Sequence, residues 1–223
     1  MAKNKLRKFS QINCYKHVVQ PTFEELKSGF SLKGKWKSEM FKNDNPLVLE
    51  LGCGKGEYSV GLAQAYPQKN FLGIDVKGAR MHKGATDSLE ESLTNVAFLR
   101  TRIEFIEWCF ETDEVDEIWI TFPDPQIKKK RAKNRLTHPT FLKRYASILK
   151  ADGLIHLKTD SQFLHGYTLG IIEGHEHSLE DAEHDIYNAQ LQRPHLHIKT
   201  HYEKLFLEKD MPITYLRFSL NRA

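Results

Sequence analysis

Residues 48–56 read V-L-E-L-G-C-G-K-G, a short apolar run followed by three glycines at alternate positions. The run predicts a buried strand, and the pattern after the glycines predicts a helix. Because glycine has no Cβ, a ligand can approach the backbone of such a turn closely. Residues 70–75, N-F-L-G-I-D, read as a second strand that ends in Asp75. A carboxylate at that strand end can accept hydrogen bonds from both hydroxyls of a ribose. Together the two stretches predict a nucleoside-cofactor site.

The spacing of the glycines indicates which nucleoside the site prefers. Dinucleotide folds carry G-x-G-x-x-G, and their loop opens a helix whose N-terminus holds a pyrophosphate. This chain has G-x-G-x-G, and Glu50 stands two residues before Gly52. A carboxylate there repels a pyrophosphate but attracts a sulfonium or an ammonium group. The pattern therefore favours S-adenosylmethionine over a nicotinamide dinucleotide or a plain structural turn. A salt-bridged residue at a strand end is the structural alternative for Glu50.

Apolar runs alternate with amphipathic stretches from Leu47 onward. Strands are expected at 47–51, 70–75, 96–100, 117–121 and 153–158, and helices at 58–66, 78–93, 103–110, 139–149 and 161–173. Such alternation predicts an α/β fold with a mostly parallel sheet and helices on both faces. Residues 185–187 and 214–220 are expected to add a closing antiparallel pair, with a helix at 202–208 between them. Ligands of such sheets bind at the carboxyl ends of the strands.

Residues 1–45 are polar and basic, whereas the strand pattern begins after them. We expect a partly mobile basic extension over 1–45 and one domain over 46–223. Within the extension, residues 22–28 predict a short helix, because Thr22 and Glu25 have the spacing of a capping box.

Length, charge and cysteine usage narrow the class of protein. The chain has 223 residues and a net charge of +4. It has no apolar run of about 18 residues and no apolar N-terminal segment, so neither a membrane span nor a secretory signal is expected. Its three cysteines lie far apart: Cys14, Cys53 and Cys109. That spacing favours free thiols in a reducing cytoplasm over a disulfide framework or a zinc site.

A second group of functional residues follows the strand expected at 117–121. Residues 121–127 read T-F-P-D-P-Q-I, and the two prolines stiffen the loop around Asp124. Six of the eight residues at 128–135 are cationic. A rigid turn and a solvated charged face are the structural alternatives. Like charges beside a cofactor site favour a polyanionic partner, and a nucleic-acid backbone is the obvious one.

The histidines, the tryptophans and Cys53 each have a possible functional role and a structural alternative. The chain has eleven histidines, and its H-x-H pairs at 175/177 and 195/197 lie in polar, loop-like contexts without the helical i,i+4 spacing of a zinc peptidase, so no metal site is expected. Trp108 and Trp119 lie in apolar segments and are expected in the core. For Trp36, packing onto the domain is favoured over stacking on a base. Cys53 is expected to fill space in the glycine turn rather than to act as a nucleophile.

These motifs resemble those of the bacterial tRNA (guanine-N7)-methyltransferases. The likeness rests on E-L-G-C-G-K-G, F-L-G-I-D, F-P-D-P with its basic run, K-T-D at 158–160 and T-H-Y-E at 200–203. It covers nearly the whole chain from Leu47 onward. The chain departs from the family at Gln126 and Ile127, where tryptophan and histidine are usual, and at Arg102, which aligns with an acidic residue near the adenine.

The resemblance implies a Rossmann-like class I methyltransferase with a mostly parallel seven-stranded sheet. It implies S-adenosylmethionine as cofactor, a guanosine in the variable loop of tRNA as acceptor, and the following site residues. Glu50, Gly52, Gly54, Asp75 and Arg102 would bind the cofactor; Asp124 would lie between cofactor and base and act in catalysis; Lys128, Asp160, Thr200 and Glu203 would contact the substrate. We expect a cytoplasmic monomer, with a homodimer as the alternative. The alternative functions are methylation of another RNA base and RNA binding without catalysis.

Overall fold

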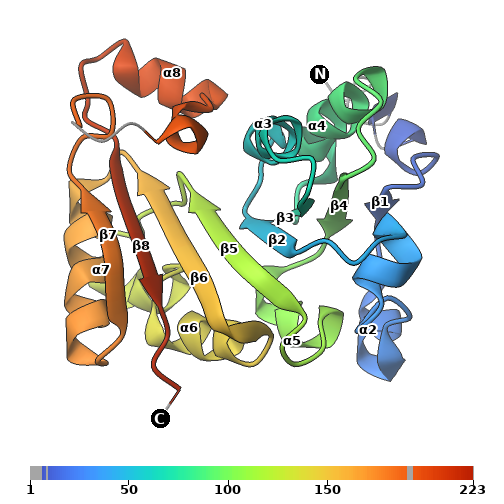
Figure 1. Ribbon diagram of the computed structural model, residues 1–223, viewed down its shortest axis with the longest axis horizontal. Helices are drawn as coiled ribbons and strands as arrows, with labels where there is room; N and C mark the ends of the chain where they lie inside the picture. Colours follow the sequence, from blue (N-terminus) through green and yellow to red (C-terminus); the bar gives the residue numbers. More distant parts are fainter. Residues whose placement is uncertain (1–6, 9, 190–192, 223) are drawn as a thin grey trace. The chain divides into compact units, whose positions relative to one another are not determined.

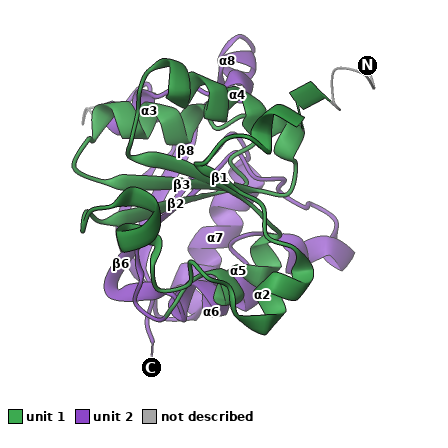
Figure 2. Cartoon of the chain, turned by 90° about the vertical axis from the view of Figure 1, so that its right-hand side faces the viewer, with its two compact units in different colours: residues 1–111 green, residues 112–223 purple. Residues whose placement is uncertain are grey.

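The computed structural model describes residues 7–8, 10–189 and 193–222. The chain forms two compact units, residues 1–111 and 112–223 (Figure 2). Within the first unit, the described part of the N-terminal extension buries Ile12 and Trp36 completely. The indole of Trp36 donates to the Cys109 carbonyl at 3.0 Å, which confirms packing for this tryptophan. Residues 1–6 and 9 of the extension that is expected to be partly mobile lie outside the described ranges, and the domain boundary at 45/46 stays a prediction.

The first unit contains four parallel strands in the order β1-β4-β3-β2. Their bounds are β1 Val18–Val19, β2 Leu47–Leu51, β3 Asn70–Asp75 and β4 Val96–Arg100. All five residues of β2 are buried, as a continuous apolar run predicts for a strand covered on both faces. The bounds of β2, β3 and β4 are those that the sequence predicts. The two-residue β1 was not expected, because so short a segment has no periodic signal.

Helices cover both faces of these four strands (Figure 2). On one face lie α3 (Glu57–Ala65) and α4 (Gly78–Glu90); on the other lie α2 (Phe23–Gly29) and α5 (Ile106–Cys109). Thr22 and Glu25 form the predicted capping box of α2. A π-helix, η1 (Trp36–Phe41), and a 3-10 turn, η2 (Ile103–Phe105), complete the unit. The core position expected for Trp108 is wrong. Its side chain is 37% exposed, since α5 is a single surface turn that buries only Ile106 and Cys109.

The second unit contains four strands in the order β5-β6-β8-β7 (Figure 1). Their bounds are β5 Val115–Thr121, β6 Leu149–Thr159, β7 Ser178–Glu183 and β8 Thr214–Ser219. β5 and β6 are parallel, and β8 runs antiparallel to both β6 and β7. The strand expected at 185–187 is wrong, because the pairing falls on S-L-E-D-A-E instead. The described residues therefore form eight strands, four in each unit, rather than seven.

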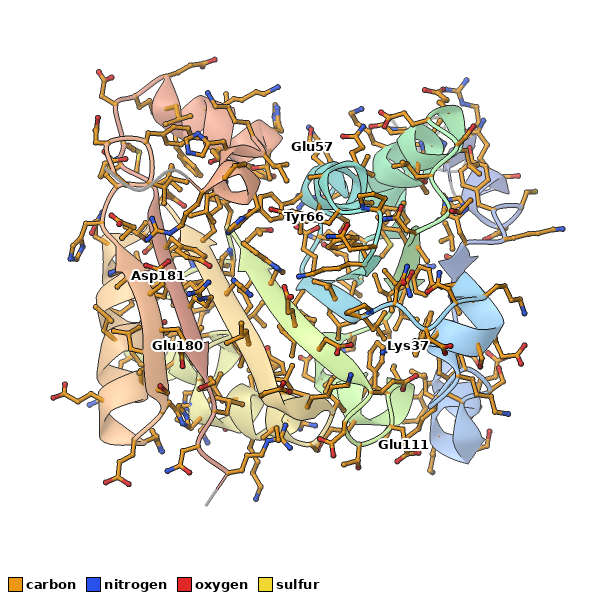
Figure 3. All side chains as sticks on the ribbon, viewed as in Figure 1. Lys37, Glu57, Tyr66, Glu111, Glu180 and Asp181 are labelled. Carbon is orange, nitrogen blue, oxygen red and sulfur yellow. The ribbon has the colours of Figure 1, made fainter. Side chains whose placement is uncertain are left out.

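The polar sequence of β7 explains why the sequence did not predict this strand. β7 is an edge strand, and its residues are exposed or half-buried. Charges on an edge strand prevent pairing with other chains, so alternation of apolar residues is absent there. Glu180 and Asp181 are labelled in Figure 3. Asp181 pairs with Arg193 at 2.7 Å, which ties the segment after β7 back to the strand.

The helices of the second unit are η3 (Lys129–Asn134), α6 (Pro139–Ala146), α7 (Gln162–Gly174), η4 (Pro194–His197) and α8 (His201–Leu207). Figure 1 shows α6 and α7 behind the strands of this unit and α8 beyond the carboxyl end of β6. Trp119 of β5 is 3% exposed, as predicted, and stacks on His156 with ring centroids 4.0 Å apart. No helix among the described residues is long and apolar enough to cross a bilayer.

Candidate functional site

The glycine turn after β2 is fixed by the end of β3. Gly52 and Gly54 have φ angles of +78° and +56°, which favour glycine. The Ile74 carbonyl accepts hydrogen bonds from the amides of Gly52 at 2.8 Å and Cys53 at 3.0 Å. A Cβ built on Gly52 would meet none of the described atoms within 4 Å. A ligand therefore has room beside this backbone.

Asp75 organises the same turn through its carboxylate. Oδ2 accepts from the Gly54 amide at 3.0 Å, and Oδ1 accepts from the Lys77 amide at 2.7 Å. An ionised carboxylate offers about four acceptor positions, so capacity remains for the hydroxyls of a ribose. The structure thus brings Gly52, Gly54 and Asp75 together at the carboxyl ends of β2 and β3.

Glu50 lies below the turn, 3% exposed. Its Oε2 accepts from the backbone amide and the hydroxyl of Ser59, at 2.9 and 2.5 Å. Ser59 is in the first turn of α3, where the helix dipole favours a negative charge. Glu50 therefore connects β2 to the helix that follows the glycines, and its charge is held close to the turn.

Cys53 is buried within the glycine turn. Burial, together with the charges of Glu50 and Asp75, raises the pKa of its thiol well above the ordinary value. A thiol that resists ionisation is a poor nucleophile. The side chain is 6% exposed and fills space beside Gly73, which agrees with the structural role expected of it.

Arg102 stands at the wall of a pocket of about 260 Å³ in the first unit. The residue after Asp75, Val76, forms another part of that wall, and the remaining lining residues are Gln20, Pro21, Phe23, Leu26, Arg100, Thr101 and Phe105. The Arg102 guanidinium pairs with Glu104 at 3.0 Å and lies 5.7 Å from the centre of the Phe105 ring. The pocket combines apolar walls with cationic groups, which suits a flat heterocycle.

Asp124 belongs to the second unit and lies on an exposed loop after β5. Its Oδ1 accepts from the backbone amide of Gln126 at 3.0 Å. Phe122 and Gln126, on either side of it, both have a φ of +46°, a backbone conformation that residues other than glycine rarely adopt. The carboxylate is thus fixed in direction by a strained loop, as the flanking prolines predict.

The cations after this loop fall into two groups. Lys128, Lys129, Lys130, Arg131 and Lys133 are exposed, whereas Arg135 is 6% exposed. The exposed group forms a positive surface beside Asp124, as a phosphate-binding role requires.

Asp160 follows β6, the strand next to β5. Thr121 is in register with Lys158, and the Phe122 amide donates to the Lys158 carbonyl at 2.8 Å. Asp124 and Asp160 therefore follow neighbouring strand ends. Asp160 is half-buried, and this burial raises the pKa of its carboxyl group.

Thr200 and Glu203 lie at the start of α8 and are buried. They form a capping box, in which the Thr200 hydroxyl accepts from the Glu203 amide at 3.2 Å. The fully buried Glu203 carboxylate pairs with Lys158 at 2.7 Å and accepts from the Tyr187 hydroxyl at 2.8 Å. These contacts give both residues a role in positioning α8.

Lys158 and Arg135 are the residues of this region whose positions the sequence did not predict. Lys158 is fully buried and donates to the carbonyls of Leu196 and Ile198 at 2.5 and 3.2 Å, besides pairing with Glu203. A lysine at the end of an apolar strand is a signal that could have indicated a buried charge in need of a partner. Its partner lies far along the chain, so the pairing itself had no local signal.

His201 is the first residue of α8, directly after Thr200, and the His197 ring packs against that of Tyr187 with centroids 5.2 Å apart. Among the described residues, no cluster of three or more His, Cys, Asp or Glu side chains could hold a metal ion.

Comparisons with known proteins bear on both fold and chemistry. The family model described as "Putative methyltransferase" matches residues 44–216. A tRNA (guanine-N(7)-)-methyltransferase of Christiangramia forsetii is 58% identical over 98% of this chain and 99% of its own length. An enzyme of the same name from Bacteroides thetaiotaomicron is 49% identical, over 99% of this chain and 87% of its own length. The crystal structure of the 16S rRNA methyltransferase KamB has a TM-score of 0.61 at 13% identity, covering 89% of this chain and 92% of that one. This last likeness shows the fold of a class I methyltransferase.

Proposed function

Because the chain belongs to the S-adenosylmethionine-dependent tRNA (guanine-N7)-methyltransferase family, we propose that it methylates N7 of a guanine in the variable loop of tRNA. The observation that carries this proposal is the near full-length match, at 58% identity, to an enzyme of that name. The exposed cations beside Asp124 support a polyanionic acceptor.

The residues of the first unit fit the cofactor. The backbone beside Gly52 is open, and the Asp75 carboxylate has acceptor capacity for a ribose. The pocket at Val76 and Arg102 has apolar walls for an adenine, and we assign Arg102 to that wall. Glu50 places a buried negative charge below the turn, which would stabilise the cationic groups of the ligand. When bound, S-adenosylmethionine supplies a methyl group on a positively charged sulfur.

Guanine N7 has an in-plane lone pair and no proton, so the protein needs no general base to expose it. Methylation places positive charge on the purine ring, and the ring N1–H and the exocyclic amine become more acidic. A fixed carboxylate that accepts hydrogen bonds from these groups orients the base and offsets the developing charge. We assign this role to Asp124, because its loop holds the carboxylate in one direction.

The remaining residues of the second unit act on the tRNA. Lys128 is an exposed cation suited to a phosphate, and Asp160, after the neighbouring strand, would be a second acceptor for the base. Thr200 and Glu203 would act through the position of α8, because their polar groups already bond within the unit. We further propose that the protein is monomeric and works in the cytoplasm, where the three free thiols are stable.

The direct test is product analysis. The protein is incubated with S-adenosylmethionine carrying a labelled methyl group and with unmodified tRNA, and the digested nucleosides are identified by mass spectrometry. We expect labelled 7-methylguanosine, and a ribonuclease digest to oligonucleotides should place the label in the variable loop. Label in another base would favour a different RNA methyltransferase. Binding of tRNA with no label transferred would favour a relative that binds RNA without catalysis.

A further inference from the structure

Arg135 ends the basic run, but its surroundings differ from those of the other cations. It is 6% exposed, whereas Lys130 and Lys133 are exposed. Its guanidinium carbon lies 4.3 Å from the centre of the Tyr167 ring and 4.8 Å from that of Phe163. Both aromatic residues belong to α7. Arginine binds aromatic faces in this way through its planar, delocalised charge.

The hydrogen bonds of Arg135 go to the loop that carries Asp124. Nε donates to the carbonyls of Pro125 and Gln126, both at 3.3 Å, and Nη2 donates to those of Gln126 at 3.1 Å and Ile127 at 3.5 Å. One guanidinium thus bonds three successive carbonyls. The N–H groups of Nε and Nη2 point to the protein's own backbone, so these groups are poorly placed for a phosphate.

These contacts join α7 to the Asp124 carboxylate through Gln126. Gln126 has a φ of +46°, a conformation that needs support from its surroundings. Arg135 bonds its carbonyl, while the amide of the same residue donates to Asp124 Oδ1 at 3.0 Å. A loss of the guanidinium would let Gln126 relax, and the Asp124 carboxylate would lose its fixed direction.

We propose that Arg135 is a positioning residue for the methyl transfer, which holds the Asp124 loop in its productive conformation and does not bind tRNA phosphates. This inference rests on the proposed function. It divides the basic run into five exposed cations that face the tRNA and one buried cation that faces the loop.

Kinetics of matched variants separate the two roles. For Arg135→Ala we expect kcat to fall by about 10²-fold, with the KM for tRNA and its salt dependence nearly unchanged. Lys133→Gln, the control that removes an exposed cation, should raise that KM and flatten its salt dependence without lowering kcat. If Arg135→Ala behaves like Lys133→Gln, Arg135 is a phosphate ligand and the proposal is wrong.

Two further variants keep the test decisive if Arg135→Ala folds poorly. Tyr167→Leu removes one aromatic face and no charge; positioning predicts a fall in kcat of several-fold, whereas phosphate binding predicts no change. Arg135→Lys keeps the charge but loses the planar fork, so positioning predicts low kcat and phosphate binding predicts near wild-type kinetics. Added methylguanidinium should partly restore kcat to Arg135→Ala by occupying the vacated space. Wild-type kcat in both Tyr167→Leu and Arg135→Lys would overturn the proposal.

A readout independent of the reaction distinguishes this inference from the proposed function. Hydrogen exchange measured on a peptide spanning residues 122–127 should be faster in Arg135→Ala than in the wild type or in Lys133→Gln. If exchange is faster in Arg135→Ala but the wild-type protein makes no 7-methylguanosine, the contact between Arg135 and the loop stands and the proposed reaction is rejected. Unchanged exchange, with wild-type methylation intact, would reject the positioning role alone.

Discussion

At the scale of single residues, Gly56 combines a left-handed backbone conformation with a crowded Cβ position. It has a φ of +74° and precedes α3 in the cofactor turn. A Cβ there would meet the Phe98 ring at 2.6 Å and the Gly84 backbone at 3.2 Å. We expect Gly56→Ala to cost about 1 kcal/mol from its φ angle and a further 1–3 kcal/mol from the overlap, measured by urea unfolding.

Gly34 provides the matched control, because its φ is also +74°. A Cβ on Gly34 would come no closer than 3.5 Å to any described atom, which is ordinary contact. Gly34→Ala should therefore show the cost of the φ angle alone. Equal losses of stability in the two variants would contradict the role given to Phe98 packing.

Asp124 is the residue on which the proposed chemistry depends most. Asp124→Asn keeps the shape of the side chain but removes its charge, so we expect kcat to fall by about 10²-fold or more. The affinity for S-adenosylmethionine, measured by calorimetry, should stay unchanged. Asp152→Asn, which alters an exposed aspartate in β6, is the control. Wild-type turnover in Asp124→Asn would remove Asp124 from the mechanism.

At the scale of elements, the Lys158–Glu203 pair joins β6 to α8. Both side chains are fully buried, so removal of one partner leaves an uncompensated charge. We expect Lys158→Met to cost about 3–5 kcal/mol in unfolding free energy, and Lys158→Met with Glu203→Leu to cost less than the sum of the single changes. The pair Lys83–Asp87, in which the lysine is exposed and the aspartate half-buried, is the control, and Lys83→Met should cost about 0.5 kcal/mol or less. Additive losses at Lys158 and Glu203 would show that the two side chains do not interact.

His165 of α7 makes the stability of the second unit depend on pH. Burial lowers its pKa from 6.5 to about 4, and neither ring nitrogen has a hydrogen-bond partner among the described residues. Above pH 6.5 both folded and unfolded chains hold this residue neutral. As the pH falls towards 4 only the unfolded chain takes up the proton, so stability is lost over that window, by at most about 3 kcal/mol.

The variant His165→Leu should lack this loss. We expect the difference in unfolding free energy between the wild type and the variant to shift in favour of the variant as the pH falls from 7 to 4. Unfolding in urea at several pH values measures that difference. A difference that is constant with pH would show that His165 titrates alike in the folded and unfolded chains.

At the scale of the whole molecule, the sequence predicts those strands and site residues that a local pattern of residues specifies. The bounds of β2, β3 and β4 could be predicted because each is a continuous apolar run between turn signals. The glycine turn and Asp75 could be predicted because their residues are local to those strand ends. β7 could not, because an edge strand is protected by charge rather than marked by alternation.

The contacts that bring distant segments together had no such signal. The ion pair of Lys158 with Glu203 joins elements that are separate in sequence. The packing of Arg135 against the rings of Phe163 and Tyr167 does the same. In a single sequence, Arg135 is indistinguishable from the five exposed cations before it. Only burial separates a residue that holds the loop from those that face a partner.

Methylation of tRNA in which guanosine is replaced by 7-deazaguanosine tests the central claim most directly. This tRNA keeps its phosphates and its base-pairing groups but has a carbon in place of N7. We predict labelled 7-methylguanosine from the unmodified transcript and no transfer to the substituted one, which should still bind and compete with the normal substrate. Equal methyl transfer to both transcripts would contradict attack by guanine N7.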